Sequence, residues 1–214
     1  MIGLFDSGSG GINTVRYIKE ISDTQDLVYL IDRKNAPYGT RSKKELISIT
    51  ERNIKELSDR GAERVLIACC TASTVYPYIA EEYKKISVPI IEAAANEAKK
   101  LTRTRRIGVI ATKRTVASHA FKKALPGISV TEHPLSELVP LIDGGLCDQA
   151  VTEDDVRMIE AILYPVLKRR IDTLVLGCTH FPSLRRTISE IATEYGVKET
   201  VDTALVGARL IVGQ

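Results

Sequence analysis

The chain has 214 residues, of which 44% are hydrophobic, so it can form one large or two small domains with hydrophobic cores. Its 30 basic and 27 acidic residues give a net charge of only +3, and no long run of Lys or Arg occurs, which argues against nucleic acid as the primary partner. No apolar run reaches transmembrane length, and Met1 leads directly into a strand pattern, so we expect a cytoplasmic protein without membrane contacts.

The strand and helix patterns alternate along the chain. Short apolar or β-branched runs predict strands at residues 2–5, 27–31, 64–68, 88–91, 106–111, 172–177 and 198–202. Amphipathic patterns between them predict helices, most clearly at residues 43–58, 153–168 and 184–194. Such alternation is typical of βαβ units, so the expected fold class is α/β, with mostly parallel sheets flanked by helices.

A glycine-rich segment, "DSGSGG" at residues 6–11, follows the first strand. Glycines there let the backbone approach a ligand closely, and the next helix offers unpaired N–H groups to an anion. The spacing fits neither a dinucleotide fingerprint nor a Walker loop. A plain turn capped by Asp6 is the structural alternative.

Two later segments repeat one pattern. "LIACCTAST" at residues 66–74 and "LVLGCTHFPS" at residues 174–183 each run from a strand through Cys and Thr into a helix start. This predicts a duplicated architecture, with a crossover helix near residues 93–105. We therefore expect a first domain of residues 1–95 plus 203–214 and a second domain of residues 96–202.

The four cysteines, Cys69, Cys70, Cys147 and Cys178, are better interpreted as free thiols than as a disulfide framework. Cys69 and Cys178 end parallel strands, where open α/β sheets bind ligands, and a nearby helix N-terminus favours a thiolate. His180 could exchange a proton with Cys178. The alternative is that these cysteines are small buried hydrophobes, and Cys147 is interpreted as a bystander.

The chain offers no C-x-x-C clip and no lysine in a recognisable Schiff-base setting. We therefore expect neither a metal nor pyridoxal phosphate, and no other cofactor.

Four segments taken in order resemble the cofactor-independent glutamate racemases of the aspartate/glutamate racemase superfamily. They are "DSGSGG" at 6–11, "PYG" at 37–39, "CCTAS" at 69–73 and "GCTHFP" at 177–182. The resemblance implies two pseudo-symmetric α/β domains that hold a small amino acid between them. It also implies an isomerase that interconverts L- and D-glutamate for peptidoglycan and cell-wall synthesis, and hence for cell shape.

The resemblance also implies roles for individual residues. Cys69 would act on the D-substrate with help from Asp6, and Cys178 on the L-substrate with help from His180. Asp143 stands where the family has a glutamate with a supporting role. The implied substrate-binding residues are Ser7, Tyr38, Gly39, Cys70, Thr71, Ser73, Thr112, Thr115 and Thr179.

The sequence departs from the family pattern in three places. Cys70 replaces an asparagine, so a thiol stands where an amide would bond the substrate, unless Cys70 packs inward as an apolar filler. Glu92 and Ala93 replace Gly-Val, which adds a negative charge near the crossover. The chain also ends earlier than a typical member, so we expect part of the first domain's closing structure to be absent.

Two other functions remain compatible with these residues: a superfamily racemase, isomerase or lyase acting on another amino or carboxylic acid, and a non-catalytic relative that binds a ligand. The sequence leaves the oligomeric state open, including a homodimer.

Overall fold

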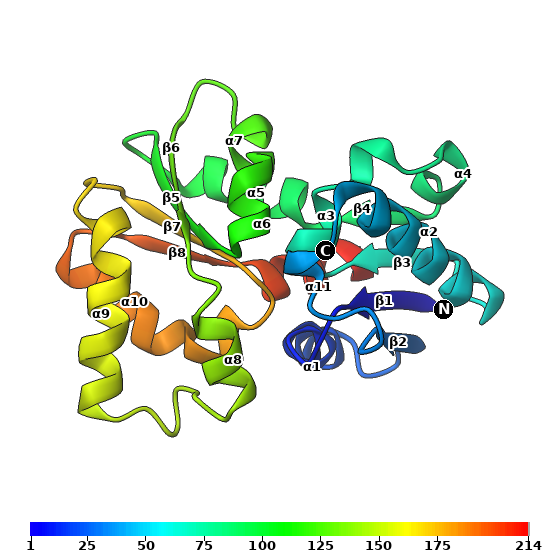
Figure 1. Cartoon of the computed structure of the whole chain (residues 1–214), viewed down its shortest axis with the longest axis horizontal. Helices are drawn as coiled ribbons and strands as arrows, with labels where there is room; N and C mark the ends of the chain where they lie inside the picture. The colour runs from blue at the N-terminus through cyan, green and yellow to red at the C-terminus, as the bar shows by residue number, and fades with distance from the viewer. Residues whose placement is uncertain (214) are drawn as a thin grey trace.

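The computed structural model describes residues 1–213, which form two four-stranded parallel sheets flanked by helices (Figure 1). The first sheet has the order β2-β1-β3-β4, and the second has the order β6-β5-β7-β8. The first sheet consists of β1 (Ile2–Asp6), β2 (Leu27–Ile31), β3 (Arg64–Ile67) and β4 (Ser87–Pro89). The second consists of β5 (Arg106–Ala111), β6 (Ser129–Pro134), β7 (Thr173–Gly177) and β8 (Glu199–Asp202). The two halves therefore repeat one topology, and the predicted α/β class is confirmed.

The helices connect the strands and cover the sheets (Figure 1). In the first half they are α1 (Gly11–Ile21), η1 (Tyr38–Thr40), α2 (Lys43–Asp59), α3 (Cys70–Ser73), η2 (Tyr76–Tyr78) and α4 (Glu81–Lys84). They continue with α5 (Ile90–Leu101), α6 (Lys113–Ser118), α7 (Ala120–Ala124), α8 (Leu138–Asp143), α9 (Glu153–Leu167), η3 (Phe181–Leu184), α10 (Arg185–Glu194) and α11 (Thr203–Val212). No helix within residues 1–213 is both long and apolar enough to cross a bilayer.

The structure corrects two expectations about the strands. The run predicted as a strand at residues 88–91 is divided, because β4 ends at Pro89 and Ile90 begins α5. Pro89 cannot donate a ladder hydrogen bond, and it precedes the first turn of α5. Strand β6 was not predicted, because the polar residues in "SVTEHP" hide it on the edge of the second sheet.

Helix α5 is the predicted crossover, but it begins and ends earlier than residues 93–105. It packs against α11, α7, β7 and β8. Helix α11 returns from the second sheet to pack mainly against α1 and α5. The proposed division into residues 1–95 plus 203–214 and 96–202 stays a prediction, and its last residue, Gln214, lies outside the described residues.

The strand register places the segments that follow β1 and β3 next to each other, and likewise the segments that follow β5 and β7. Phe5 pairs with Ile67, so the residues that follow β1 and β3 leave the first sheet side by side. Ala111 pairs with Gly177 in the second sheet, so Thr112 and Cys178 do the same. In parallel sheets these carboxyl ends are where ligands bind.

Asp172, just before β7, holds the segment that links α5 to β5. Its carboxylate accepts hydrogen bonds from Thr102 Oγ1 (2.6 Å) and from the backbone N–H groups of Arg103 (2.8 Å) and Thr104 (2.6 Å). Burial opposes its charge, but these hydrogen bonds outweigh that effect and lower the pKa of Asp172 to about 2.

We expect Asp172→Asn to lower the free energy of unfolding by about 1–3 kcal/mol at pH 7, because one amide NH₂ would face backbone donors. The contribution of Asp172 is complete above its usual pKa of 3.8 and is lost as the pH falls towards about 2. The stability gap between the two proteins should therefore narrow over that interval in denaturant titrations. Asp23→Asn, at an exposed position, is the control, and a gap that stays constant with pH would contradict the assignment.

Candidate active site

A cavity of about 490 Å³ lies between the carboxyl ends of the two sheets and is called here the central cavity. The first half contributes Ser7 after β1, residues 37–40 and residues 69–71 after β3. The second half contributes residues 112–113 after β5, Ser136, Val139, Pro140 and Asp143 after β6, and residues 177–180 after β7. The walls therefore come from both sheets.

Cys69 and Cys178 stand in equivalent places on the two sides of this cavity. Cys69 follows β3 and precedes α3, while Cys178 follows β7 and precedes η3. Both side chains are buried and both line the central cavity. The two similar sequence segments thus bring Cys69 and Cys178 to a single site.

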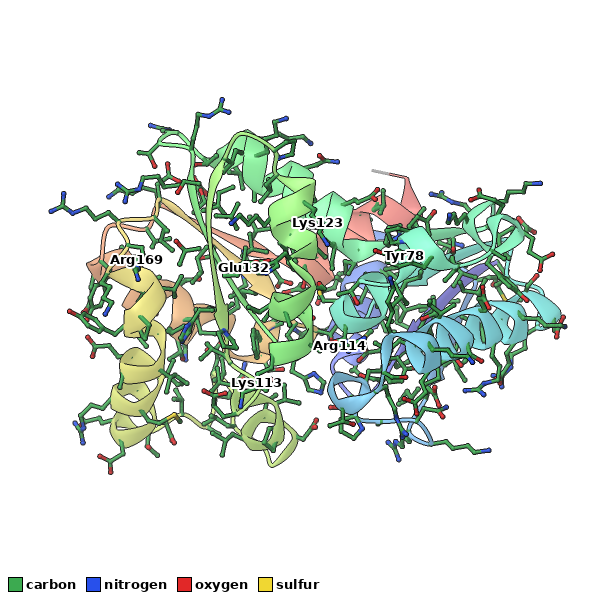
Figure 2. The ribbon with its side chains drawn as sticks, turned by 45° about the horizontal axis from the view of Figure 1, so that its top comes forward. Tyr78, Lys113, Arg114, Lys123, Glu132 and Arg169 are labelled. Carbon is green, nitrogen blue, oxygen red and sulfur yellow. The ribbon has the colours of Figure 1, made fainter. Side chains whose placement is uncertain are left out.

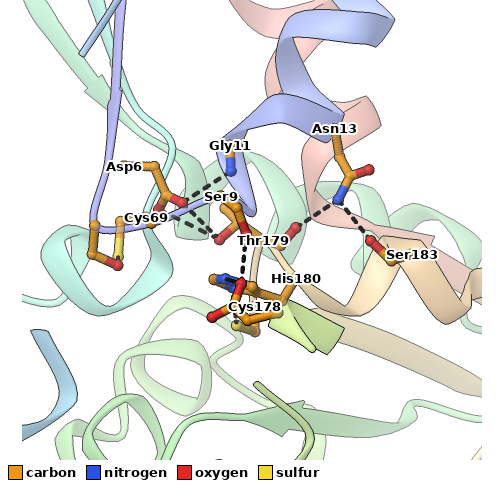
Figure 3. A network of polar contacts seen from close by, with 12 residues as sticks. Asp6, Ser9, Gly11, Asn13, Cys69, Cys178, Thr179, His180 and Ser183 are labelled. Carbon is orange, nitrogen blue, oxygen red and sulfur yellow. Dashed lines mark hydrogen bonds and ion pairs between the residues drawn. The ribbon is translucent and has the colours of Figure 1, made fainter. Parts of the chain in front are cut away.

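Asp6 is fully buried behind the cavity wall and joins the two halves. Its Oδ2 accepts a hydrogen bond from the N–H of Gly11 (2.9 Å), and Thr179 Oγ1 donates to its two oxygens at 3.3 and 3.4 Å (Figure 3). Burial raises the pKa of Asp6, while the charge of His180 and backbone N–H groups oppose the rise. Within residues 1–213 it makes no hydrogen bond to Cys69, so any help it gives that thiol is electrostatic.

The Cys69 thiol has a weak polar environment. Its Sγ lies 3.7 Å from Ser7 Oγ, and the side chain is 5% exposed. Burial, and after it the negative charge of Asp6, raise the pKa of Cys69 well above its usual value. Cys69 is therefore a protonated thiol at neutral pH.

Cys178 has a different partner. His180 Nδ1 lies 3.7 Å from Cys178 Sγ (Figure 3). His180 Nε2 lies 3.2 Å from Asp143 Oδ1. Burial alone would lower the pKa of His180, but the hydrogen bond to Cys178 and the charges of Cys178, Asp6 and Asp143 outweigh it and raise this pKa to about 9. His180 is therefore cationic at neutral pH beside the second sulfur.

Asp143 also spans the two halves. It ends α8 and accepts a hydrogen bond from Ser9 Oγ, in the glycine-rich loop, at 2.6 Å. The same Oδ1 faces the imidazole of His180. Asp143 thus links the loop after β1 to the histidine that contacts Cys178.

Three threonine hydroxyls meet across the cavity floor. Thr71 Oγ1 lies 3.0 Å from Thr112 Oγ1 and 3.2 Å from Thr115 Oγ1, and the last two lie 2.9 Å apart. Thr71 and Thr112 line the cavity, while Thr115 is buried behind them. Each hydroxyl can both donate and accept, so the group can reorganise around a carboxylate.

Other candidates lie differently from the expected arrangement. Tyr38 and Gly39 line the central cavity, but the Tyr38 hydroxyl donates to Asp32 Oδ2 (2.7 Å) and accepts from Asn53 Nδ2 (2.8 Å), so it is not free. Ser73 does not line this cavity, because its hydroxyl donates to Ile67 O and accepts from Ile90 N. The structure therefore does not bring Ser73 to the predicted binding site.

Cys70 lies both in the cavity wall and in a hydrophobic cluster with Leu66, Ile90 and Ala94. Its side chain is only 3% exposed, and burial raises its pKa well above the usual value. This packing favours the alternative in which Cys70 acts as a small apolar filler.

Lys113, Ser136, Val139 and Pro140 line the cavity but were not among the predicted site residues. Lys113 follows Thr112 at the end of β5, and its backbone N–H donates to Ser136 Oγ at 2.8 Å. The end of a parallel strand was the signal that could have identified Lys113. The others follow β6, the strand that the sequence pattern did not reveal.

The two halves approach each other closely at Gly10. A Cβ atom there would lie 2.5 Å from Thr179 Oγ1 and 2.8 Å from the backbone N of His180. Any side chain would force the loops apart, so this position of "DSGSGG" needs glycine. Within residues 1–213, no group of three His, Cys, Asp or Glu side chains is arranged to hold a metal.

Comparisons with known proteins place these features in context. The sequence profile of the Asp/Glu/Hydantoin racemase family matches residues 12–211. A glutamate racemase of Gloeobacter violaceus is 38% identical over 197 residues, which cover 89% of this chain and 72% of that protein. One from Lactobacillus acidophilus is 32% identical over 194 residues, covering 88% and 71% respectively.

Solved structures of glutamate racemases have a similar fold. A glutamate racemase from Francisella tularensis, crystallised with D-glutamate, superposes with a TM-score of 0.85 at 29% identity and covers 99% of this chain and 79% of its own. An isoform from Bacillus anthracis gives the same TM-score of 0.85 at 26% identity, with coverage of 100% and 80%.

The raised pKa of His180 can be measured directly. We expect its imidazole to titrate with a pKa of about 9 in NMR spectra, and Asp143→Asn to lower that pKa because a facing negative charge is removed. Asp154→Asn, at an exposed position, should leave the pKa unchanged. An Asp143→Asn protein whose His180 titrates as in the unaltered protein would show that the ion pair does not hold the proton.

Proposed function

The chain belongs to the Asp/Glu/hydantoin racemase family, and from this we propose that it interconverts L- and D-glutamate by proton transfer between Cα and two cysteines. The observation that carries the proposal is that Cys69 and Cys178, one from each half, line a single cavity. The solved relative with bound D-glutamate supports the choice of substrate.

The reaction needs an acid and a base on opposite faces of one carbon. For L-glutamate, Cys178 accepts the Cα proton, so a C–H bond breaks and an S–H bond forms. Cys69 then delivers its own proton to the other face, and the new C–H bond gives D-glutamate. The reverse reaction starts with the proton on Cys178 and the negative charge on Cys69.

The electrostatic environments support different resting roles for the two thiols. Cys69 holds its proton because burial and Asp6 disfavour its thiolate. Cys178 lies beside the cationic His180, which can stabilise negative charge on the sulfur. L-glutamate would react with the form in which Cys69 is the thiol and Cys178 the thiolate.

The cavity hydroxyls and one lysine are suited to hold the substrate. We assign the polar groups of glutamate to Ser7, Thr71, Thr112 and Thr179, which are cavity-lining residues with hydroxyl groups. Lys113 is the one Lys or Arg among the described residues that line the cavity, so we assign it the side-chain carboxylate. D-glutamate made in this way in the cytoplasm would serve peptidoglycan synthesis.

Replacing either cavity cysteine should stop racemisation but not all exchange. We expect Cys69→Ser and Cys178→Ser to lower kcat/KM for racemisation by about 10²–10⁴-fold, the range for losing one acid/base group. In heavy water, Cys69→Ser should still exchange the Cα proton of L-glutamate and Cys178→Ser that of D-glutamate. Cys147→Ser, outside the cavity, is the control.

Two results would contradict this mechanism. Near-normal racemisation by both single variants would exclude a two-thiol reaction. Absence of Cα exchange with glutamate in the unaltered protein, together with exchange on another amino acid, would assign a different substrate to the same site.

The role of Lys113 is testable through the Michaelis constant. Lys113→Met should raise KM for glutamate by about tenfold, the effect of losing about 1.4 kcal/mol from a charge-assisted hydrogen bond, with a smaller change in kcat. Lys19→Met, on the exposed end of α1, is the matched control. An unchanged KM would assign the side-chain carboxylate to the threonine hydroxyls alone.

A further inference from the structure

Three side chains lie in series between the glycine-rich loop and Cys178. Ser9 Oγ donates a hydrogen bond to Asp143 Oδ1 at 2.6 Å, and the same carboxylate oxygen lies 3.2 Å from His180 Nε2. His180 Nδ1 in turn lies 3.7 Å from Cys178 Sγ. The series begins in the first half of the molecule and ends at the sulfur in the second half, and the reaction proposed above gives no role to Ser9.

The contact between Asp143 and His180 does not by itself fix the carboxylate. Although the two atoms lie 3.2 Å apart, His180 Nε2 has no hydrogen-bond partner within residues 1–213, so the contact is an ion pair without hydrogen-bond alignment. Charge attraction alone has no preferred orientation, and the Asp143 side chain is 48% exposed, so water competes for it. Asp143 therefore needs a second contact to stay against the imidazole.

The chain around Asp143 supplies little further restraint. Helix α8 has six residues and ends at Asp143, and Gly144 and Gly145 follow, the latter with a φ of +109°. Lys113, labelled in Figure 2, lines the same cavity but forms no ion pair with Asp143 among the described residues. Within that part of the chain, Ser9 is the one donor of a hydrogen bond to this carboxylate.

The backbone of the glycine-rich loop is held on both sides of Ser9. Gly8 O accepts a hydrogen bond from the Tyr29 hydroxyl at 3.0 Å, and Ser9 O accepts one from the N–H of Ile12 at 3.0 Å in the first turn of α1. The loop also lies against the imidazole (Figure 3), because a Cβ atom on Gly8 would be 3.5 Å from His180 Nε2. A well-anchored loop thus presents the Ser9 hydroxyl to α8.

We propose that Ser9 is a positioning residue for the racemisation, and that its hydroxyl holds the Asp143 carboxylate against His180, which then keeps its proton beside the second thiol. This inference rests on the proposed two-thiol reaction and adds a residue of the first half to it. A distance of 2.6 Å is typical of a hydroxyl bonded to an ionised carboxylate, and such a bond is stronger than one between neutral groups. Ser9 does not touch the reacting atoms, so its effect passes through Asp143 and His180.

Asp143 is the group around His180 whose position can change most easily. The hydrogen bond to Cys178 and the charges of Cys178, Asp6 and Asp143 raise the pKa of His180 to about 9. Asp6 and Cys178 are buried, whereas the Asp143 side chain is half-exposed. When the carboxylate turns towards water, the pKa of His180 falls, so the imidazolium loses its proton at a lower pH as the pH rises.

NMR titration of the histidines tests the inference without requiring turnover. The chain has only three histidines, so the His180 signals can be assigned. We expect Ser9→Ala to lower the pKa of His180 below its value in the unaltered protein. Ser9→Thr keeps a hydroxyl and should restore the original pKa. Ser9 is exposed, so both variants should retain the fold.

The same variants should differ in their pH–rate profiles. Ser9→Ala should lower kcat/KM for glutamate racemisation by about three- to tenfold, the effect of losing one hydrogen bond. The alkaline limb of its profile should move to lower pH, because the cation beside Cys178 is lost earlier. Ser9→Thr should again behave like the unaltered protein.

Two further comparisons separate positioning from a general loosening of the halves. Asp143→Asn removes the charge that Ser9 holds, so adding Ser9→Ala to it should leave the pKa of His180 at the value found in Asp143→Asn alone. Tyr17→Phe is the control, because it removes another hydrogen bond between the halves, from the Tyr17 hydroxyl to Asp202 Oδ2 at 2.9 Å. It should leave the pKa of His180 unchanged.

An unchanged His180 pKa in Ser9→Ala would overturn the inference, as would an equal fall in Tyr17→Phe or a further fall in the double variant. Failure of the proposed function has a different signature. Absence of Cα exchange with glutamate in the unaltered protein would refute the racemase proposal, while the NMR titration would still decide whether Ser9 holds Asp143 against the imidazole.

Discussion

The architecture of the central cavity depends on one buried carboxylate. Asp6 is fully enclosed, and such a group is costly to bury unless hydrogen bonds satisfy it. Its hydrogen-bond partners include the N–H of Gly11, at the start of α1, and the hydroxyl of Thr179, in the loop after β7. Satisfying the carboxylate therefore requires the two halves to be in contact, and that contact brings the two cysteines to a common space.

The two walls of that space differ chemically although the halves share a topology. Cys69 lies near a buried negative charge and a serine hydroxyl, whereas Cys178 lies beside a histidine that faces Asp143. One sulfur is consequently surrounded by groups that disfavour its negative charge, and the other lies beside a cation. The two sulfurs thus have different electrostatic surroundings although the backbone folds of the halves match.

The positions of Cys69 and Cys178 could be predicted from local sequence patterns, because each cysteine follows a strand whose apolar character is plain in the sequence. The patterns failed where tertiary contacts decide. Strand β6 lies on a sheet edge and mixes polar with apolar residues, so the cavity residues that follow it stayed hidden. The hydroxyls of Tyr38 and Ser73 bond to Asp32, Asn53, Ile67 and Ile90, partners that only the folded chain brings within reach.

The requirement for glycine at position 10 also constrains how the two halves of the protein can evolve. The space that a single methyl group would occupy is already filled by Thr179 and His180 of the opposite half. The halves therefore cannot vary independently, even though each has its own complete sheet. A chimera assembled from halves of two relatives would retain both sheets. Its cavity would form only if the glycine-rich loop of one half were sterically compatible with the loop after β7 of the other half.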